Sequence, residues 1–457
     1  MKQYRKTLWS LVICFTTFFV FHPCIAENVR KLTTLSFTEL QKNTKHFNNA
    51  FFLMRQFHEL KIESQTIHGL SFEKVVLHKP IFKNVIFEDC NLTHTLFMNG
   101  EFENVSFKNC RLKESQFKNT VFNNVSFIGG EIEMLRAERD NKEDYVNEMF
   151  EQHAFLYVNN KGTLLFDAVR FKEVNIFSLE GGNVILRNMK DFSYHPKYGR
   201  MFEGKNTLLR IENTTIAGLE GIAELNAPAS IYISESLIQG GEIKAYGRDE
   251  KFPNFYAENS QLIKGFQART FEHLVMKNGM LGGVLEAKNV FLVNSELDKP
   301  TQKDTHPEIP KLVGDKIYVL GNGKKAELLY TRSRDELNVF DLSLETLSVS
   351  GKINALNLYK LKLDNFHFDS GVELDGGHWE EVEVLSQMKA ASPGKYKFKS
   401  VEVHEVKLHG GNKIEDARVS KEFSSNENYE LETKPGEKSL TPEKIVVPTP
   451  ETLGMSL

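Results

Sequence analysis

The chain has 457 residues, 40% of them hydrophobic, so it is long enough to bury a large core. Its formal net charge is −4 and charged residues make up 26%, a balance that argues against a basic surface for nucleic acid. Phenylalanine occurs 35 times and tryptophan twice, which indicates that one residue type fills a repeated position.

Residues 1–26 have the pattern of a secretory signal peptide. Three basic residues precede an apolar run over residues 8–21, and small residues at Cys24 and Ala26 precede an expected cleavage before Glu27. The alternative is an uncleaved anchor, but about 14 apolar residues fall short of the roughly 20 that span a bilayer. We therefore predict an exported chain without a membrane span after cleavage, with residues 27–46 as its N-terminal cap.

Over residues 47–132 a Phe, Leu or Ile stands at almost every fifth position, most regularly over residues 72–132. A helix repeats its buried face every 3.6 residues and a strand every 2.0, so neither element alone produces this spacing. The segments around Cys90 and Cys110 also repeat after four such units. The simplest structure with both periods is a square coil, five residues per side, whose fifth side chains point to the axis. Stacked coils then share hydrogen bonds as parallel strands do.

Small side chains two residues before each central residue are expected to face inward near the corners. Cys90 and Cys110 occupy two such positions, one coil apart. We interpret them as small core residues, and a disulfide formed after export is the alternative.

This pattern resembles the pentapeptide-repeat family, whose unit is a small residue, Asn or Asp, Leu or Phe, and two polar residues. The closest units are residues 89–93 (DCNLT) and 109–113 (NCRLK). The resemblance implies a quadrilateral solenoid over residues 47–132. The residue before the central one departs from the family pattern because it is often apolar, which suggests that part of the outer surface is covered. These positions are Val76, Ile81, Ile86, Leu96 and Val121.

Residues 133–157 lose the five-residue period. Asn141 fits an N-cap, and Tyr145, Val146, Met149 and Phe150 recur at helical spacing. We expect a helical insertion here that caps or packs on the solenoid, with a partner-binding helix as the alternative.

Residues 158–296 contain short apolar strands that recur, with glycines at the turns, at intervals of roughly 20 to 25 residues. We interpret them as a looser parallel β-helix. Residues 297–314 carry three prolines and no period, so they are predicted to be a loop, and regular strands return over residues 315–420. Residues 421–457 have four prolines and few core-forming residues, and are predicted to be a disordered tail, a tether or docking tail being its functional alternative.

The predicted fold is thus all-β: a right-handed parallel β-helix with an N-terminal quadrilateral pentapeptide-repeat part, a short helix insertion and a disordered C-terminal tail. The sequence contains no phosphate loop, G-x-S-x-G, H-E-x-x-H or paired C-x-x-C motif. We therefore predict no catalytic residues, no metal and no cofactor.

One cluster of polar residues is the best candidate for a site. Strand alternation turns His367, Asp369, Glu373 and Asp375 outward, and His378 follows a glycine pair in the same stretch. Carboxylates so placed can bind calcium or act as acid and base on a glycan. A solvated face of the solenoid is the simpler interpretation.

The sequence predicts an exported, non-enzymatic scaffold or binding surface for a protein or glycan, in the cell envelope or outside the cell. A first alternative is a β-helix polysaccharide lyase or hydrolase. A second follows from the resemblance, a DNA mimic that binds topoisomerases. That role needs a cytosolic and strongly acidic solenoid, whereas this chain has lysines through its repeats, such as Lys83, Lys108 and Lys118.

Overall fold

The computed structural model describes most of the chain between residues 47 and 455. The described segments are residues 47–134, 153–172, 174–190, 202–217, 221–226, 229–246, 252–298, 310–321, 325–368, 373–374, 376–390, 396–404, 407–408, 414–415, 418–419, 429–435 and 445–455. They fall into two compact units, Met1–Leu165 and Phe166–Leu457. The predicted signal peptide and N-terminal cap lie outside the described residues. Within the described part, no helix is long and apolar enough to cross a membrane.

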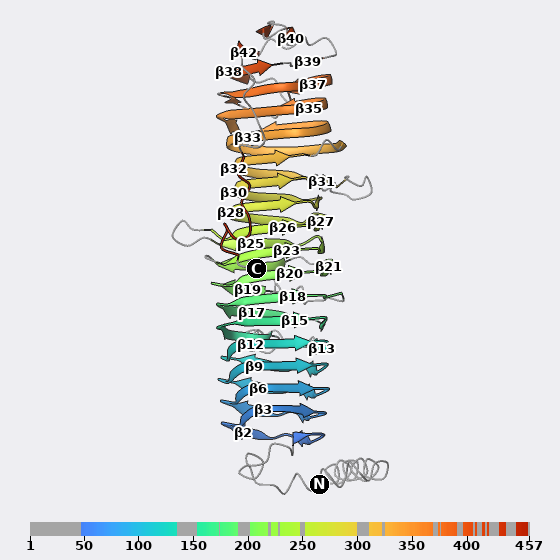
Figure 1. Ribbon diagram of the computed structural model, residues 1–457, viewed down its shortest axis with the longest axis vertical. Helices are drawn as coiled ribbons and strands as arrows, with labels where there is room; N and C mark the ends of the chain where they lie inside the picture. Colours follow the sequence, from blue (N-terminus) through green and yellow to red (C-terminus); the bar gives the residue numbers. More distant parts are fainter. Residues whose placement is uncertain are drawn as a thin grey trace, which may run out of the picture. The chain divides into compact units, whose positions relative to one another are not determined.

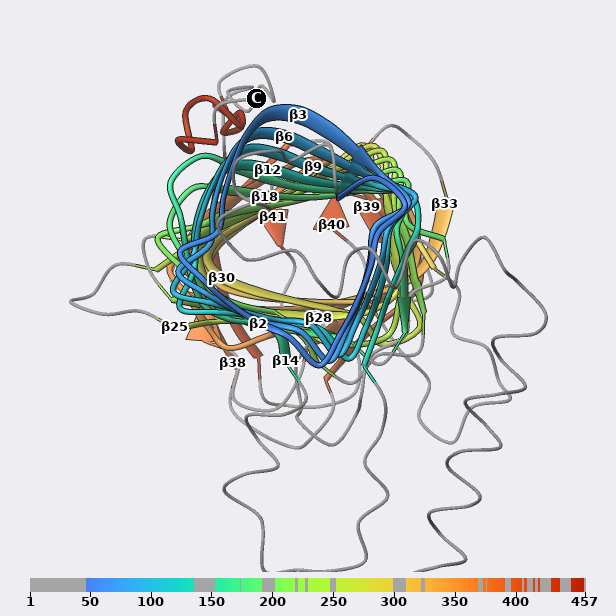
Figure 2. The same ribbon diagram turned by 90° about the horizontal axis from the view of Figure 1, so that it is seen from below.

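The first unit is a stack of four-sided parallel coils (Figures 1 and 2). Its longer strands are β3 Lys61–His68, β6 Ile81–Glu88, β9 Glu101–Lys108, β12 Val121–Ile128 and β14 His153–Asn160. Its three-residue strands are β1 Phe51–Leu53, β2 Gln56–His58, β4 Ser71–Glu73, β5 Val76–His78, β7 Asn91–Thr93, β8 Leu96–Met98, β10 Arg111–Lys113, β11 Gln116–Lys118 and β13 Glu131–Glu133. Strand β15 Thr163–Asp167 crosses the boundary between the units.

The core of this unit is a set of phenylalanine ladders. Phe87 stacks on Phe107 with ring centroids 5.1 Å apart, and Phe107 on Phe127 at 4.8 Å, with the rings within 9° of parallel. All three side chains are buried. Equivalent residues of successive coils pair directly in the sheet. The predicted five-residue side and the predicted stack are therefore confirmed, and each ring pair adds stacking energy to the burial of apolar area.

The corners explain the asparagines of the repeat. Asn84, Asn104 and Asn124 lie two residues after an inward Phe and have φ values of 53°, 52° and 57°. Asparagine tolerates this left-handed conformation better than other residues that carry a Cβ. The Nδ2 of Asn104 also donates a hydrogen bond to the Oδ1 of Asn84, 3.0 Å away in the preceding coil.

Cys90 and Cys110 are free and buried, in agreement with their interpretation as small core residues. The Cys90 thiol donates to the carbonyl of Ile67 at 3.6 Å, and the Cys110 thiol to that of Phe87 at 3.3 Å. A hydrogen bond with Cys90 and burial raise the pKa of the Cys110 thiol. Both sulfurs thus serve the packing between coils.

Only the two ends of the predicted helical insertion lie within the described residues. Residues 135–152 lie outside the described residues, but His153–Asn160 forms strand β14 and Glu133 ends β13. Ala154, Leu156 and Val158 are buried at strand spacing, and Phe155 stacks on Phe117 at 5.3 Å. The insertion is therefore shorter than predicted at its C-terminal end, because these apolar residues complete the next coil.

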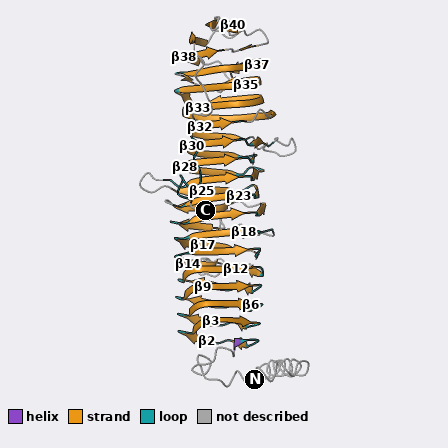
Figure 3. Ribbon diagram, in the orientation of Figure 1, coloured by secondary structure: helices purple, strands orange, loops and turns teal. Residues whose placement is uncertain are grey.

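The second unit is a parallel β-helix with coils of unequal length, since Leu186 pairs with Ile211, Ile211 with Ile233, and Val275 with Phe291. Its described residues are almost entirely strand and turn (Figure 3). The strands up to residue 297 are β16 Arg170–Lys172, β17 Asn175–Glu180, β18 Asn183–Arg187, β19 Phe202–Lys205, β20 Leu208–Glu212, β21 Thr215–Ala217, β22 Gly221–Asn226, β23 Ser230–Ser234, β24 Leu237–Gln239, β25 Glu242–Tyr246, β26 Asn254–Glu258, β27 Gln261–Ile263, β28 Gln267–Lys277, β29 Met280–Leu281, β30 Val284–Val293 and β31 Glu296–Leu297.

Parallel pairing returns after the predicted loop. The remaining strands are β32 Lys311–Leu320, β33 Lys325–Ser350, β34 Lys352–Ile353, β35 Ala355–Phe368, β36 Glu373–Leu374, β37 Gly377–Ala390, β38 Tyr396–His404, β39 Lys407–Leu408, β40 Ile414–Glu415, β41 Arg418–Val419 and β42 Tyr429–Pro435. Strand β32 begins inside the predicted loop 297–314, whose residues 299–309 lie outside the described residues. Strands β40 and β41 form an antiparallel pair.

The C-terminal part differs from the predicted disordered tail in two segments. Strand β42 pairs in parallel with β38, and residues 445–455 pack against the coils. The tail is poor in apolar residues, but Ile445, Val447, Leu453 and Met455 are gathered in its last part, where they cover apolar side chains of the coils. The burial of these few apolar side chains therefore holds the last part of the tail against the coils, although the tail as a whole is poor in apolar residues.

Candidate binding surface

The structure brings together little of the polar row predicted between residues 367 and 378. His367 is half-buried between the inward Phe366 and Phe368, as alternation predicts. Asp369 and Asp375 lie outside the described residues, and of Glu373 only the backbone in β36 is described. The described residues hold no group of three or more His, Cys, Asp or Glu side chains able to bind a metal ion.

His378 was expected beside this outward row, but the structure buries it. Its side chain is only 8% exposed and its Nε2 lies 3.5 Å from the carboxylate of Glu380, which is fully buried. Trp379 between them faces the core and contacts Phe366. This strand is therefore covered on both faces, and the residue is not part of a solvated face.

A different feature stands out on the outside of the second unit. The parallel pairings of β23, β26, β28, β30 and β32 align one outward side chain from each strand in a column across the coils. We call this column the apolar stripe; its residues are Tyr232, Tyr256, Val275, Phe291 and Tyr318. Such a column is unexpected on an outer face, where polar residues are the rule.

Four of the five stripe residues are nearly inaccessible to solvent although they lie outside the coil, and Tyr318 is half-buried. Tyr232, Tyr256, Val275 and Phe291 are exposed by 5%, 3%, 0% and 6%. Tyr232 stacks on Tyr256 with centroids 5.9 Å apart, and Phe291 on Tyr318 at 4.7 Å. Neighbouring coils stack on one another along the stripe, and a segment from the end of the chain packs on the same cluster.

That segment is residues 445–455, here called the C-terminal strap. Met455 is fully buried in one apolar cluster with the stripe, and Ile445, Val447 and Leu453 pack against the same cluster. Figure 2 shows the red C-terminal segment outside the ring of coils. The Nδ2 of Asn254 in β26 donates a hydrogen bond to the carbonyl of Leu453 at 3.3 Å. The strap thus covers the stripe mainly through its apolar side chains.

The end of the strap is a turn that satisfies its own backbone. The amide of Met455 donates to the carbonyl of Pro450 at 2.8 Å, and that of Leu453 to Thr449 at 3.0 Å. The amide of Thr449 donates in turn to the hydroxyl of Thr452 at 2.8 Å. Gly454 takes a φ of 73°, which suits a glycine at the end of a turn. This compact turn delivers the Met455 side chain to the stripe.

Two of the three tyrosines in the stripe, Tyr232 and Tyr318, point their hydroxyls to carboxylates. The Tyr232 hydroxyl donates to Glu258, and the Tyr318 hydroxyl donates to Glu336 at 3.4 Å. Burial, reinforced by Glu258, raises the pKa of Tyr232 above its ordinary value. Burial and the charge of Glu336 raise the pKa of Tyr318 to about 12. Both hydroxyls therefore remain neutral donors at physiological pH.

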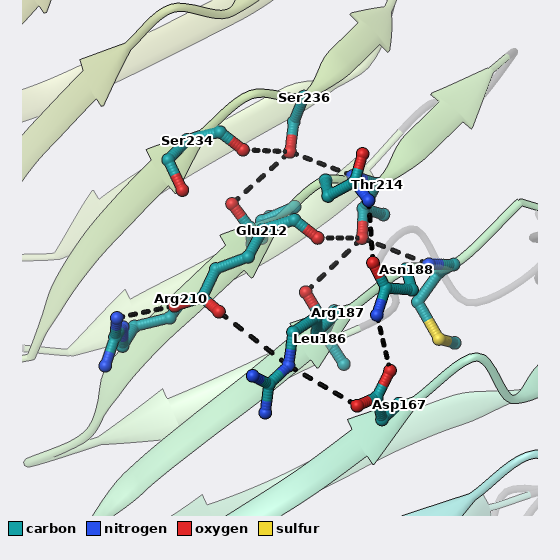
Figure 4. Close-up of polar contacts among 12 residues, drawn as sticks. Asp167, Leu186, Arg187, Asn188, Arg210, Glu212, Thr214, Ser234 and Ser236 are labelled. Atoms are coloured by element: carbon teal, nitrogen blue, oxygen red, sulfur yellow. Dashed lines mark hydrogen bonds and ion pairs between the residues drawn. The ribbon is translucent and has the colours of Figure 1, made fainter.

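Toward the start of the second unit the same face becomes charged (Figure 4). The Arg210 guanidinium lies 5.6 Å from the ring centroid of Tyr232 and pairs with Glu212. Arg187 lies 3.5 Å from the carboxylate of Asp167 and 3.9 Å from that of Glu212. These charged side chains pair with one another next to Tyr232, so they form the border of the apolar stripe on that side.

Small hydroxyl residues hold the adjoining corner between coils. Thr214 donates its amide to the Ser236 hydroxyl at 3.1 Å (Figure 4). Ser236 donates its own amide to the Ser260 hydroxyl at 3.1 Å. All three side chains are buried. Their role is to fix the spacing of the coils on which the stripe is built.

Sequence reasoning missed the stripe, although a signal was present. In the segments IYIS, FYAE, VFLV and IYVL, at residues 231, 255, 290 and 317, apolar residues occupy inward and outward positions alike. Strands that are apolar on both faces are covered on both faces. The covering strap lies far away in the sequence, and no local pattern connects it to these strands.

The fold defines a class, a parallel β-solenoid with an apolar outer surface on its second unit. Residues 66–136 match the family model described as the pentapeptide repeat region. This part of the chain is therefore a pentapeptide-repeat solenoid, as the resemblance implied. No curated protein and no solved structure matches the chain. The stripe and the strap lie beyond the residues that match the family model.

Proposed function

We propose that the protein is an exported, non-enzymatic β-solenoid that acts as a binding scaffold in the cell envelope or outside the cell. The apolar stripe on the outer face of the second unit is the observation that supports this function best. A solenoid core is satisfied by its inward side chains, so an outward apolar column adds nothing that the coil itself requires. Large apolar surfaces mark sites of interaction where they become exposed, and this one is covered by the C-terminal strap and its own stacking. The support for export is the pattern of residues 1–26.

We favour a protein as the partner over a glycan. The surface of the stripe consists of stacked rings and aliphatic groups, and the segment that covers it is itself a polypeptide. Its polar contact at the rim, the side-chain amide of Asn254, suits a backbone carbonyl group.

Export and binding are tested separately in the native host. N-terminal sequencing of the mature protein should begin at Glu27. A photoreactive amino acid at Leu320, at the edge of the stripe, should form an adduct with an envelope or extracellular protein. The matched control is Glu286, which lies on another side of the coil in strand β30.

Three results would contradict the proposal. A chain that keeps Met1 and stays in the cytosol would favour the topoisomerase alternative, and equal adducts from Leu320 and Glu286 would remove the stripe as the binding surface. Depolymerisation of an acidic polysaccharide by the purified chain would favour the lyase or hydrolase alternative.

A further inference from the structure

The stripe is built by the coils and does not depend on the strap for its shape. Its strands pair in register with the strands above and below, and their inward residues Ile231, Ile233 and Phe255 are fully buried. The backbone hydrogen bonds of each coil are completed by its neighbours. The strap adds no strand to this sheet, because its residues 445–449 have no regular secondary structure. It lies on a surface that is already formed.

The strap is attached in the way a bound peptide is attached. Met455 is the anchor in the apolar cluster, and Asn254 contacts the backbone at Leu453. Val446, between two residues that pack on the stripe, is 86% exposed. Pro448 and Pro450 restrict this stretch of backbone and lack amide donors. A short segment with few contacts opens at much lower free energy than the coils beneath it.

The length of the chain allows this segment to reach its own stripe. From β42 to β32, which carries Tyr318, the parallel pairings run through β38, β37, β35 and β33. Five strand spacings of about 4.8 Å give about 24 Å. The nine residues 436–444 supply ten Cα steps, which extend to about 33 Å or more. An intramolecular ligand on such a linker acts at roughly millimolar effective concentration.

We propose that the apolar stripe is a peptide-binding site, that the C-terminal strap is its intramolecular ligand, and that release of the strap opens it to an apolar, proline-containing segment of another polypeptide. This inference names the ligand class for the binding surface of the proposed function and rests on that function. The ligand has apolar residues two positions apart that face the rings, prolines that keep it free of sheet pairing, and a methionine-like anchor. The strap shows each of these features in place.

The test uses the full-length chain and a fluorescent peptide with the sequence of residues 445–457. Met455→Glu places a charge in the apolar cluster and should release the strap, because burying an unpaired charge is costly. This variant should bind the peptide at least tenfold more tightly than the wild-type chain, whose own strap competes. Val446→Glu changes an exposed residue of the same strap and should bind like the wild type. A peptide that carries Met455→Glu should not bind.

A second measurement covers the case in which Met455→Glu fails to fold. A protease recognition sequence placed within residues 436–444 lets the strap be cut from the folded full-length chain. Cleavage should then allow the labelled peptide to exchange into the site.

Absence of peptide binding by a folded Met455→Glu chain or by the cleaved chain would overturn the inference. Equal affinity in the wild type and Met455→Glu would also overturn it. Neither result would touch the N-terminal sequence or the Leu320 adduct, so failure here is distinguishable from failure of the proposed function.

Discussion

The two units use the same parallel coil but differ in what they bury outside it. In the first unit the coils between Phe51 and Glu133 all repeat the same register, and outward apolar residues such as Val76 and Ile81 are only half-buried. In the second unit the coil length varies, and outward residues such as Tyr256 and Phe291 are as buried as a core. A strict repeat fixes the inside of a solenoid. Where the coil length varies, as in the second unit, outward side chains can form a buried apolar surface of their own.

What the units share is the corner. In the first unit Asn109, with a φ of 50°, precedes the buried Cys110; in the second, Asn213, with a φ of 46°, precedes the buried Thr214. A residue in the left-handed conformation followed by a small inward side chain therefore turns the chain in both. The two units therefore share the geometry of the corner and differ along the long sides of the coil.

The largest expected effect breaks the interior of the first unit. Phe107→Ala should lower the free energy of unfolding by about 3–5 kcal/mol, because it leaves a cavity between two stacked rings. Phe107 lies between Phe87 and Phe127, and the edge of Phe117 also packs against its ring. Urea denaturation measures the change, with Lys108→Ala on the same strand as the control. Unfolding at the parent's urea midpoint would mean that the stacking register is wrong.

A second prediction concerns the covered outside of the second unit and its response to pH. Tyr318 has a pKa of about 12 in the folded chain, above the ordinary value near 10 for a tyrosine. A raised pKa contributes stability that is fully present below pH 10 and is lost as the pH rises toward 12. Tyr318→Phe should therefore flatten the decline in urea midpoint over this range. Tyr157→Phe, at an exposed position, is the control and should leave the decline as it is.

The third prediction sharpens what the units share. Asn104→Ala should lower the free energy of unfolding by about 1–2 kcal/mol, because alanine tolerates the left-handed corner poorly. The change also removes the hydrogen bond to Asn84. Asn213→Ala in the second unit should have a similar effect, since Asn213 has the same conformation and donates to Asn188 at 2.7 Å. Glycine at either position should be tolerated better. A large effect in one unit alone would show that the corners are not equivalent.

The interior was predictable from the sequence because its information is local. The five-residue period follows directly from backbone geometry, and it placed Phe87, Phe107, Cys90 and Cys110 correctly. The strap was not predictable, because its contacts join residues 445–455 to strands that lie far away in the sequence. His378 shows a limit of the sequence analysis: its place after the glycine pair was noted, but no local pattern indicated that its side chain is buried beside Glu380.

The smallest effect is expected from charge pairs on the outside of the first unit. Lys83 Nζ lies 3.0 Å from the carboxylate of Glu103, but both side chains are more than 40% exposed. The hydrogen bond and charge of Glu103 raise the pKa of Lys83. Any stability that the folded chain gains from this pair is therefore present below the ordinary lysine pKa and is lost only at higher pH. Solvent screens such exposed pairs and their long side chains lose entropy on pairing, so Lys83→Gln should not measurably change the melting temperature.

Glu212→Gln in the second unit should lower the melting temperature, because that carboxylate is only 18% exposed and contacts both Arg187 and Arg210. Thermal melts at low and high salt compare the two variants; a fall for Lys83→Gln as large as that for Glu212→Gln would show that the outer charges of the first unit hold its coils together.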